Sequence, residues 1–177
     1  MSVTDDKHIP DASDVLLRFS LKTPFWPLSF SYGIFADPST RIYFASLDHY
    51  LAYRMLMRHE HRERIITAPN GYIAVKNLEM ILQTSASYEG DPVISPTWEQ
   101  DRDAILDEGL RLKFGQSQFM LELLLRTGDR RIYDVSRDTD THWFWCDGLG
   151  ANMHGKALMR LREHVRTGGL LSVGRIV

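Results

Sequence analysis

The chain of 177 residues has one cysteine, Cys146, and lacks any long run of apolar residues. A single cysteine excludes an internal disulfide framework and is typical of proteins kept in a reducing compartment. A membrane-spanning helix needs about 20 consecutive apolar residues, so none is expected. The first residues also lack the basic and apolar regions of a secretory signal peptide. We therefore expect a cytoplasmic protein with no membrane partner.

An excess of charge of one sign is lacking too. The 21 basic and 23 acidic residues give a net charge of −2, so composition by itself does not indicate a nucleic-acid-binding protein, although it leaves a local basic patch open. With 44% hydrophobic residues, the chain has enough apolar material for one domain with a substantial core. We expect a loose segment at 1–14, the domain at 15–168 and a tail at 169–177.

The known sequence signatures of metal and nucleotide sites are missing as well. His59 and His61 are two residues apart, which places them on different sides of a helix and favours a solvated helix end over a metal site. Gly148 and Gly150 are followed by Met153 where a dinucleotide-binding loop needs its third glycine. Cys146 is expected to be a buried, inert thiol and not a nucleophile. We therefore expect no metal and no cofactor.

What is present begins with a helix from Trp98 to about Phe114. Thr97 is a suitable cap, Gln100 stands three residues further on as a capping-box partner, and Glu99 adds negative charge at the positive end of the helix dipole. Apolar residues recur at helical spacing through the whole stretch.

Two further helices are predicted. One begins at Ser117 and ends at Gly128, because glycine suits the left-handed position past a helix end. The last follows Asn152 as its cap and ends before Gly168 and the glycine after it.

Strands are expected near both ends of the domain. The turn-rich segment 37–40 lies between two apolar stretches and indicates a hairpin within the first 45 residues, and 131–136 is short and mixed enough for another strand. Together these patterns predict a single α+β domain that is mostly helical and has a small antiparallel sheet.

Asp48 is the most informative acidic residue. It lies in a predicted helix that Ser46 caps and that runs from Leu47 to about His61, and its spacing from Leu51 puts it on or beside the apolar stripe. A carboxylate there is costly to bury without partners. It either faces a pocket as a site residue or stabilises the helix dipole from the first turn.

Three consecutive aromatic residues follow the acidic stretch near residue 140. Trp143, Phe144 and Trp145 cannot all face one core, so at least one is expected to face a ligand or a partner.

Several motifs together resemble the NADAR superfamily, a domain family named for NAD and ADP-ribose. The likeness covers roughly residues 15 to 166. The matching motifs are Ser46-Leu47-Asp48-His49-Tyr50, Trp98, Lys113-Phe114-x-Gln116, Leu123-Leu124-Leu125-x-Thr127-Gly128, Asp140-x-x-Trp143, Asn152-x-x-Gly155-Lys156 and Leu158-Met159-x-Leu161-Arg162.

The resemblance implies an N-glycosidase site. Members of the family cleave the bond between ribose C1 and a base-like nitrogen, and the oxocarbenium character of that reaction calls for a carboxylate near C1 and a group that handles water. Asp48 and Asp140 match the catalytic positions, at a site where the helix starting at Leu47, Trp98 and the 140–143 turn converge. The substrate-binding positions are expected at Trp98, Trp143, Lys113, Asn152 and Arg162.

The resemblance leaves several substrates open. Removal of ADP-ribose from guanine in DNA is placed first, followed by hydrolysis of phosphorylated riboflavin-pathway intermediates and by non-catalytic ADP-ribose binding. The partners expected are thus ADP-ribose or a ribosyl nucleotide, and ADP-ribosylated DNA. Asp48 stands where the family has glutamate, and Pro27-Leu28-Ser29-Phe30 lacks the asparagine of the family's nucleotide loop. The shorter acid loses about 1.5 Å of reach, and misplacement by about 1 Å can cost a hundredfold in rate.

Overall fold

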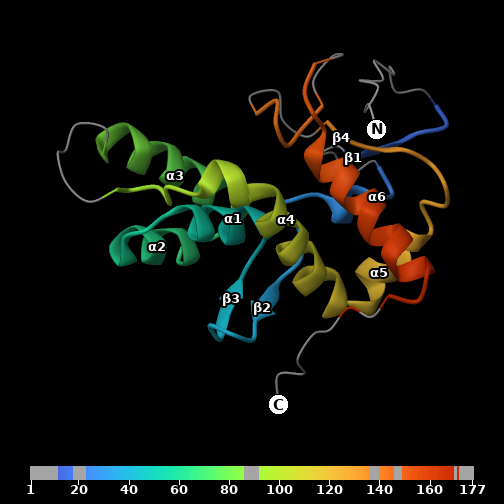
Figure 1. Cartoon of the computed structure of the whole chain (residues 1–177), viewed down its shortest axis with the longest axis horizontal. Helices are drawn as coiled ribbons and strands as arrows, with labels where there is room; N and C mark the ends of the chain where they lie inside the picture. The colour runs from blue at the N-terminus through green and yellow to red at the C-terminus, as the bar shows by residue number, and fades with distance from the viewer. Residues whose placement is uncertain are drawn as a thin grey trace.

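The computed structural model describes residues 12–17, 23–85, 92–135, 140–145, 149–169 and 171. These ranges form one α+β arrangement dominated by helices, as predicted (Figure 1). The predicted loose segment at 1–14 and the tail at 169–177 lie largely outside them, as does Cys146. The elements are β1 (Val15–Leu17), the 3₁₀ turn η1 (Trp26–Leu28), β2 (Phe35–Asp37), β3 (Ile42–Phe44), α1 (Leu47–Met55), α2 (His59–Ile66), α3 (Gly71–Ser85), α4 (Trp98–Gly115), α5 (Gln118–Leu125), β4 (Ile132–Asp134) and α6 (Met153–Arg166).

Two separate strand pairs make up the β-structure of the described residues. β2 and β3 form the predicted antiparallel hairpin, with Ala36 opposite Tyr43. β4 was expected to extend the antiparallel sheet, but it pairs in parallel with β1, with Leu16 opposite Tyr133. Parallel partners need a long crossover, and here nearly the whole domain lies between the two strands.

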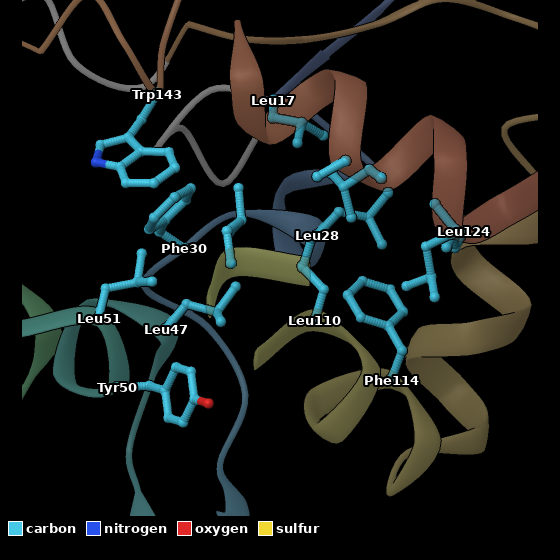
Figure 2. Packing of buried hydrophobic residues seen from close by; sticks show 14 of the residues in the cluster. Leu17, Leu28, Phe30, Leu47, Tyr50, Leu51, Leu110, Phe114, Leu124 and Trp143 are labelled. Carbon is cyan, nitrogen blue, oxygen red and sulfur yellow. The ribbon is translucent and has the colours of Figure 1, made fainter. Parts of the chain in front are cut away.

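Helix α4 runs through the middle of the molecule (Figure 1). α1, α2 and α3 lie on one side of it, and α5, α6 and the β1–β4 pair lie on the other. Figure 2 shows Leu110 and Phe114 of α4 reaching into the apolar core between these two groups. The core therefore holds both groups of elements against one central helix.

The boundaries of α4 and α5 agree with the prediction, but only one of the two caps does. Ser117 accepts a hydrogen bond from the Met120 amide at 3.3 Å, and Gly128 has the left-handed φ of +62°. Thr97 makes no side-chain cap; its carbonyl instead accepts from the Asp101 amide at 2.9 Å.

The single helix predicted from Leu47 to about His61 is wrong. The chain leaves the helix at Leu56, which forms an isolated β-bridge with Ile94, and resumes as α2. The Met57 amide donates to the Val93 carbonyl at 2.9 Å. Backbone hydrogen bonds to the 93–95 segment therefore replace those that a continuous helix would make.

Helix α3 was not predicted from the sequence. Asn70-Gly71 reads as a turn, yet Asn70 Oδ1 accepts a hydrogen bond from the Ile73 amide at 3.0 Å, as a helix cap does. Ala74 and Ile81 face the second apolar cluster of the core. None of the helices in the described ranges has the length and apolar character that crossing a membrane requires.

Gly109 sets the distance between α4 and α1. A β-carbon at this position would stand 2.7 Å from a ring carbon of Tyr50 and 2.9 Å from Leu47 Cδ2. Both side chains are fully buried, so neither can move away easily.

We expect Gly109→Ala to destabilise the fold by roughly 1 to 3 kcal/mol, because overpacking against Tyr50 outweighs the gain of about 1 kcal/mol in helix propensity. Urea unfolding measures the change. Ala104→Gly, at an exposed position of the same helix, isolates the propensity effect. A Gly109→Ala protein more stable than the native one would contradict the close approach.

Candidate functional site

Asp48 lies in the first turn of α1 and is buried, with 5% of its surface exposed. Ser31 Oγ donates a hydrogen bond of 2.6 Å to its Oδ2. The same oxygen fills the space beside Gly71 where a β-carbon would stand, which places the carboxylate against the first residue of α3. Two helix N-termini therefore favour its negative charge.

The segment 29–31 joins the parts of the site. The Ser29 carbonyl accepts a 2.7 Å hydrogen bond from Lys113 Nζ, and the Ser31 hydroxyl is the donor to Asp48. Its central ring, Phe30, lies 6.1 Å from the ring of Trp143, and Figure 2 shows the two rings as neighbours above Leu47 and Leu51. Residues from α1, α4 and the 140–144 turn therefore meet on one short segment.

Lys113 is completely buried in the last turn of α4. Burial lowers the pKa of its amine to about 7, although Asp48 and Asp134 both act to raise it. The amine is therefore partly neutral near physiological pH and can exchange a proton there. Its predicted contact with substrate stays a prediction.

Asp134 and His154 form a buried pair that sequence reasoning missed. His154 Nδ1 and Asp134 Oδ2 are 2.6 Å apart, and both side chains are fully buried. Burial lowers the pKa of His154 even though the bond to Asp134 opposes this, so we take the imidazole to be neutral and to donate from Nδ1. The sequence feature that could have indicated this pair is the position of His154 on the apolar stripe of α6, together with Leu158.

The 140–144 turn carries the second predicted catalytic acid. Asp140 Oδ1 accepts from the His142 amide at 3.0 Å and more weakly from the Trp143 amide at 3.4 Å. His142 Nε2 lies 2.7 Å from Asp103 Oδ1 of α4, and the His142 ring stands edge-on to Trp143 at 4.6 Å. His142, another residue that sequence reasoning missed, thus fastens the turn to α4.

Trp98 is buried at the start of α4 and belongs to the same apolar cluster as Leu47, Leu51 and Trp143. The three segments predicted to converge therefore do pack on one core. The segment 29–31 connects Asp48, Lys113 and Trp143, and Asp140 lies in the same turn as Trp143. Trp98 joins Trp143 only through the shared apolar cluster.

Asn152 has a different local role from the one predicted. It has a φ of +51° and makes no cap for α6; its side chain instead donates to the Ile132 carbonyl at 2.9 Å and accepts from the Asp134 amide at 3.1 Å. The expected cap is therefore wrong, since the side chain ties α6 to β4. Its contact with substrate stays a prediction.

Arg162 lies ten residues further along α6, about 15 Å away. Its guanidinium donates to Thr127 Oγ1 at 2.7 Å and to the Arg130 carbonyl at 2.9 Å. The structure thus does not bring Arg162 and Asn152 together, and the contact of Arg162 with substrate stays a prediction.

The aromatic run divides between the core and the surface. Trp143 and Phe144 are buried, whereas Trp145 is half-buried and packs edge-on against Tyr133 at 5.8 Å. The prediction that one of the three faces a ligand is left open by these contacts.

The buried amine of Lys113 makes stability depend on pH. Its folded pKa of about 7 lies below the unfolded value of 10.5, so the unfolded chain binds more protons between these values and the free energy of unfolding rises with pH there. We expect the native protein to gain up to roughly 1 kcal/mol per pH unit relative to Lys113→Met. Urea unfolding at pH 7, 8 and 9 measures the difference; a constant difference would show an unperturbed amine.

The NMR structure of the Escherichia coli protein YbiA superposes with a TM-score of 0.70 and covers 98% of this chain and 96% of its own, at 20% identity, so the two share a fold. N-glycosidase R617 of Acanthamoeba polyphaga mimivirus is 32% identical over 105 residues, in a match that covers 50% of this chain and 60% of that protein. The chain thus spans less than two thirds of this relative.

A family model described as the NADAR domain matches residues 18–166. The match runs from the end of β1 to the last residue of α6 and includes every predicted site residue. The chain therefore belongs to the NADAR family.

Proposed function

We propose that the protein is an N-glycosidase that hydrolyses the bond between ribose C1 and a guanine nitrogen, and so removes ADP-ribose from DNA. The observation that carries the proposal is the position of the buried Asp48 carboxylate. It contacts the segment 29–31 through Ser31, and the Trp143 indole contacts the same segment through Phe30. The N-glycosidase name of the mimiviral relative supports the reaction class.

Asp48 stabilises the charge that develops at C1. As the C1–N bond breaks, its electron pair moves to the leaving base and the ribose gains oxocarbenium character. A buried anion held in place by Ser31 and two helix N-termini interacts strongly with such a cation, because little water screens it and little reorganisation is needed.

Asp140 handles the attacking water. Its Oδ1 accepts two main-chain hydrogen bonds from the turn, whereas its Oδ2 accepts none from the described residues. Oδ2 is therefore available to take a proton as the water oxygen bonds to C1, while the departing nitrogen takes up a proton in its turn.

Lys113 and the tryptophans complete the site. A neutral Lys113 leaves the negative charge of Asp48 uncompensated, which favours the cationic ribose, and its pKa of about 7 permits this state at physiological pH. The indoles of Trp98 and Trp143 offer apolar walls for a base or for the cationic sugar.

Recognition of DNA rests mainly on the ADP-ribosyl group in this proposal. Several arginines of the described surface are already paired with acids: Arg54 with Glu108, Arg102 with Glu99, Arg160 with Asp107 and Arg166 with Asp129. Each of these pairs must be broken or shared before its arginine can contact a phosphate of the DNA backbone.

The substrate is identified by incubating the purified protein with three compounds in parallel. Release of ADP-ribose from guanine-ADP-ribosylated DNA supports the proposal. Release of ribose phosphate from the phosphorylated riboflavin precursor would assign the other substrate, and binding of free ADP-ribose without any turnover would make the protein a reader.

Asp48→Asn should lower kcat at least roughly a hundredfold, because it removes the charge and keeps the size of the side chain. The control is Asp101→Asn, an exposed acid in the first turn of α4, which should leave kcat unchanged. Thermal unfolding confirms that both variants fold. Full activity of Asp48→Asn would remove this carboxylate from the mechanism.

His142→Ala should lower kcat roughly ten- to a hundredfold, because the turn that carries Asp140 loses its tie to α4. Asp103→Ala should have a similar effect, and the double variant should be no worse than either single one. Steady-state kinetics give the three values. Additive losses would show that the two side chains act separately.

A further inference from the structure

A cavity lies between α4 and α6, away from the segment 29–31. Its volume is about 90 Å³, several times the minimum of roughly 10 to 15 Å³ that a cavity needs to hold one water molecule. Leu110 and Leu161 line its apolar part. Its lining on α4 lies four to eight residues beyond Asp103, a rise of about 6 to 12 Å.

The polar part of this cavity is mainly basic. Arg111 comes from α4, and Arg160 and His164 come from successive turns of α6. The one acid in the lining, Asp107, is 2.7 Å from Arg160. The guanidinium of Arg111 makes no hydrogen bond or ion pair with the described residues and is exposed.

His164 is held in position by the chain that follows α6. The Gly169 amide donates to the His164 carbonyl at 2.8 Å, and the imidazole occupies the space where a β-carbon on Gly169 would stand. The ring therefore packs against Gly169, which restricts its motion on that side and reduces the entropy that binding must cost.

We propose that this cavity between α4 and α6 binds the phosphate group of a small phosphorylated molecule. Two guanidinium groups and an imidazole supply N–H donors that suit phosphate oxygens, and guanidinium groups match them in a bidentate geometry. The apolar part accepts the carbon atoms next to the phosphate. Asp107 competes with a phosphate for Arg160, because the phosphate must share or displace the ion pair between Asp107 and Arg160. The site is independent of the proposed glycosidase reaction.

The test is a titration of the full chain with inorganic phosphate and with phenyl phosphate, followed by ¹H–¹⁵N chemical shifts. We expect shifts centred on residues 107–111 and 160–164, and tighter binding of phenyl phosphate because of the apolar part. Equal binding of the two probes would leave a site for free phosphate and overturn the small-molecule assignment. Shifts elsewhere, or none, would overturn the site.

Two substitutions should act in opposite directions. Arg160→Gln should weaken phosphate binding at least roughly tenfold, whereas Asp107→Asn should strengthen it several-fold, because it frees Arg160 and removes a negative charge. Arg166→Gln is the matched control: Arg166 also lies on α6 and pairs with an acid, Asp129, but outside the cavity. Equal effects of Arg160→Gln and Arg166→Gln would reduce the site to general electrostatic attraction.

Discussion

The interior of this protein must accommodate two ionisable groups, Asp48 and Lys113, and the segment 29–31 gives each of them a hydrogen-bond partner. The Ser31 hydroxyl donates to the carboxylate, and the Ser29 carbonyl accepts from the amine. Ionisable groups are costly to bury without hydrogen-bond partners, so the position of this segment depends on these two polar contacts as well as on packing. The Phe30 ring between them lies beside Trp143.

The sequence predicted those features that depend on local chemistry. Ser117 caps α5 by accepting from the Met120 amide, and Gly128 takes the left-handed conformation just past its end, so the α5 boundaries follow from residues of the segment itself. Features that depend on partners distant in sequence were not predicted. α1 ends early because Leu56 meets Ile94, and Asn152 turns from its helix to β4. The sequence around each of these residues does not indicate either contact.

The candidate site divides in the same way. The family motifs predicted Asp48, Trp98, Lys113 and Trp143; the two tryptophans belong to one apolar cluster, and the segment 29–31 contacts Asp48, Lys113 and Trp143. The roles of His142 and His154 were not predicted, because each histidine pairs with an aspartate that is remote in sequence. Asp103 is 39 residues from His142, and Asp134 is 20 residues from His154. Spacing rules apply along one helix or strand and cannot pair residues across elements.

The parallel pairing of β1 with β4 also bears on biosynthesis. α1, α2 and α3 contact one another and can assemble early, but β1 waits until residues 132–134 have left the ribosome before it finds its neighbour. Until then the apolar side chains of Val15 and Leu17 lack a covering strand. Nascent chains halted before β4 are therefore the ones that should require chaperones.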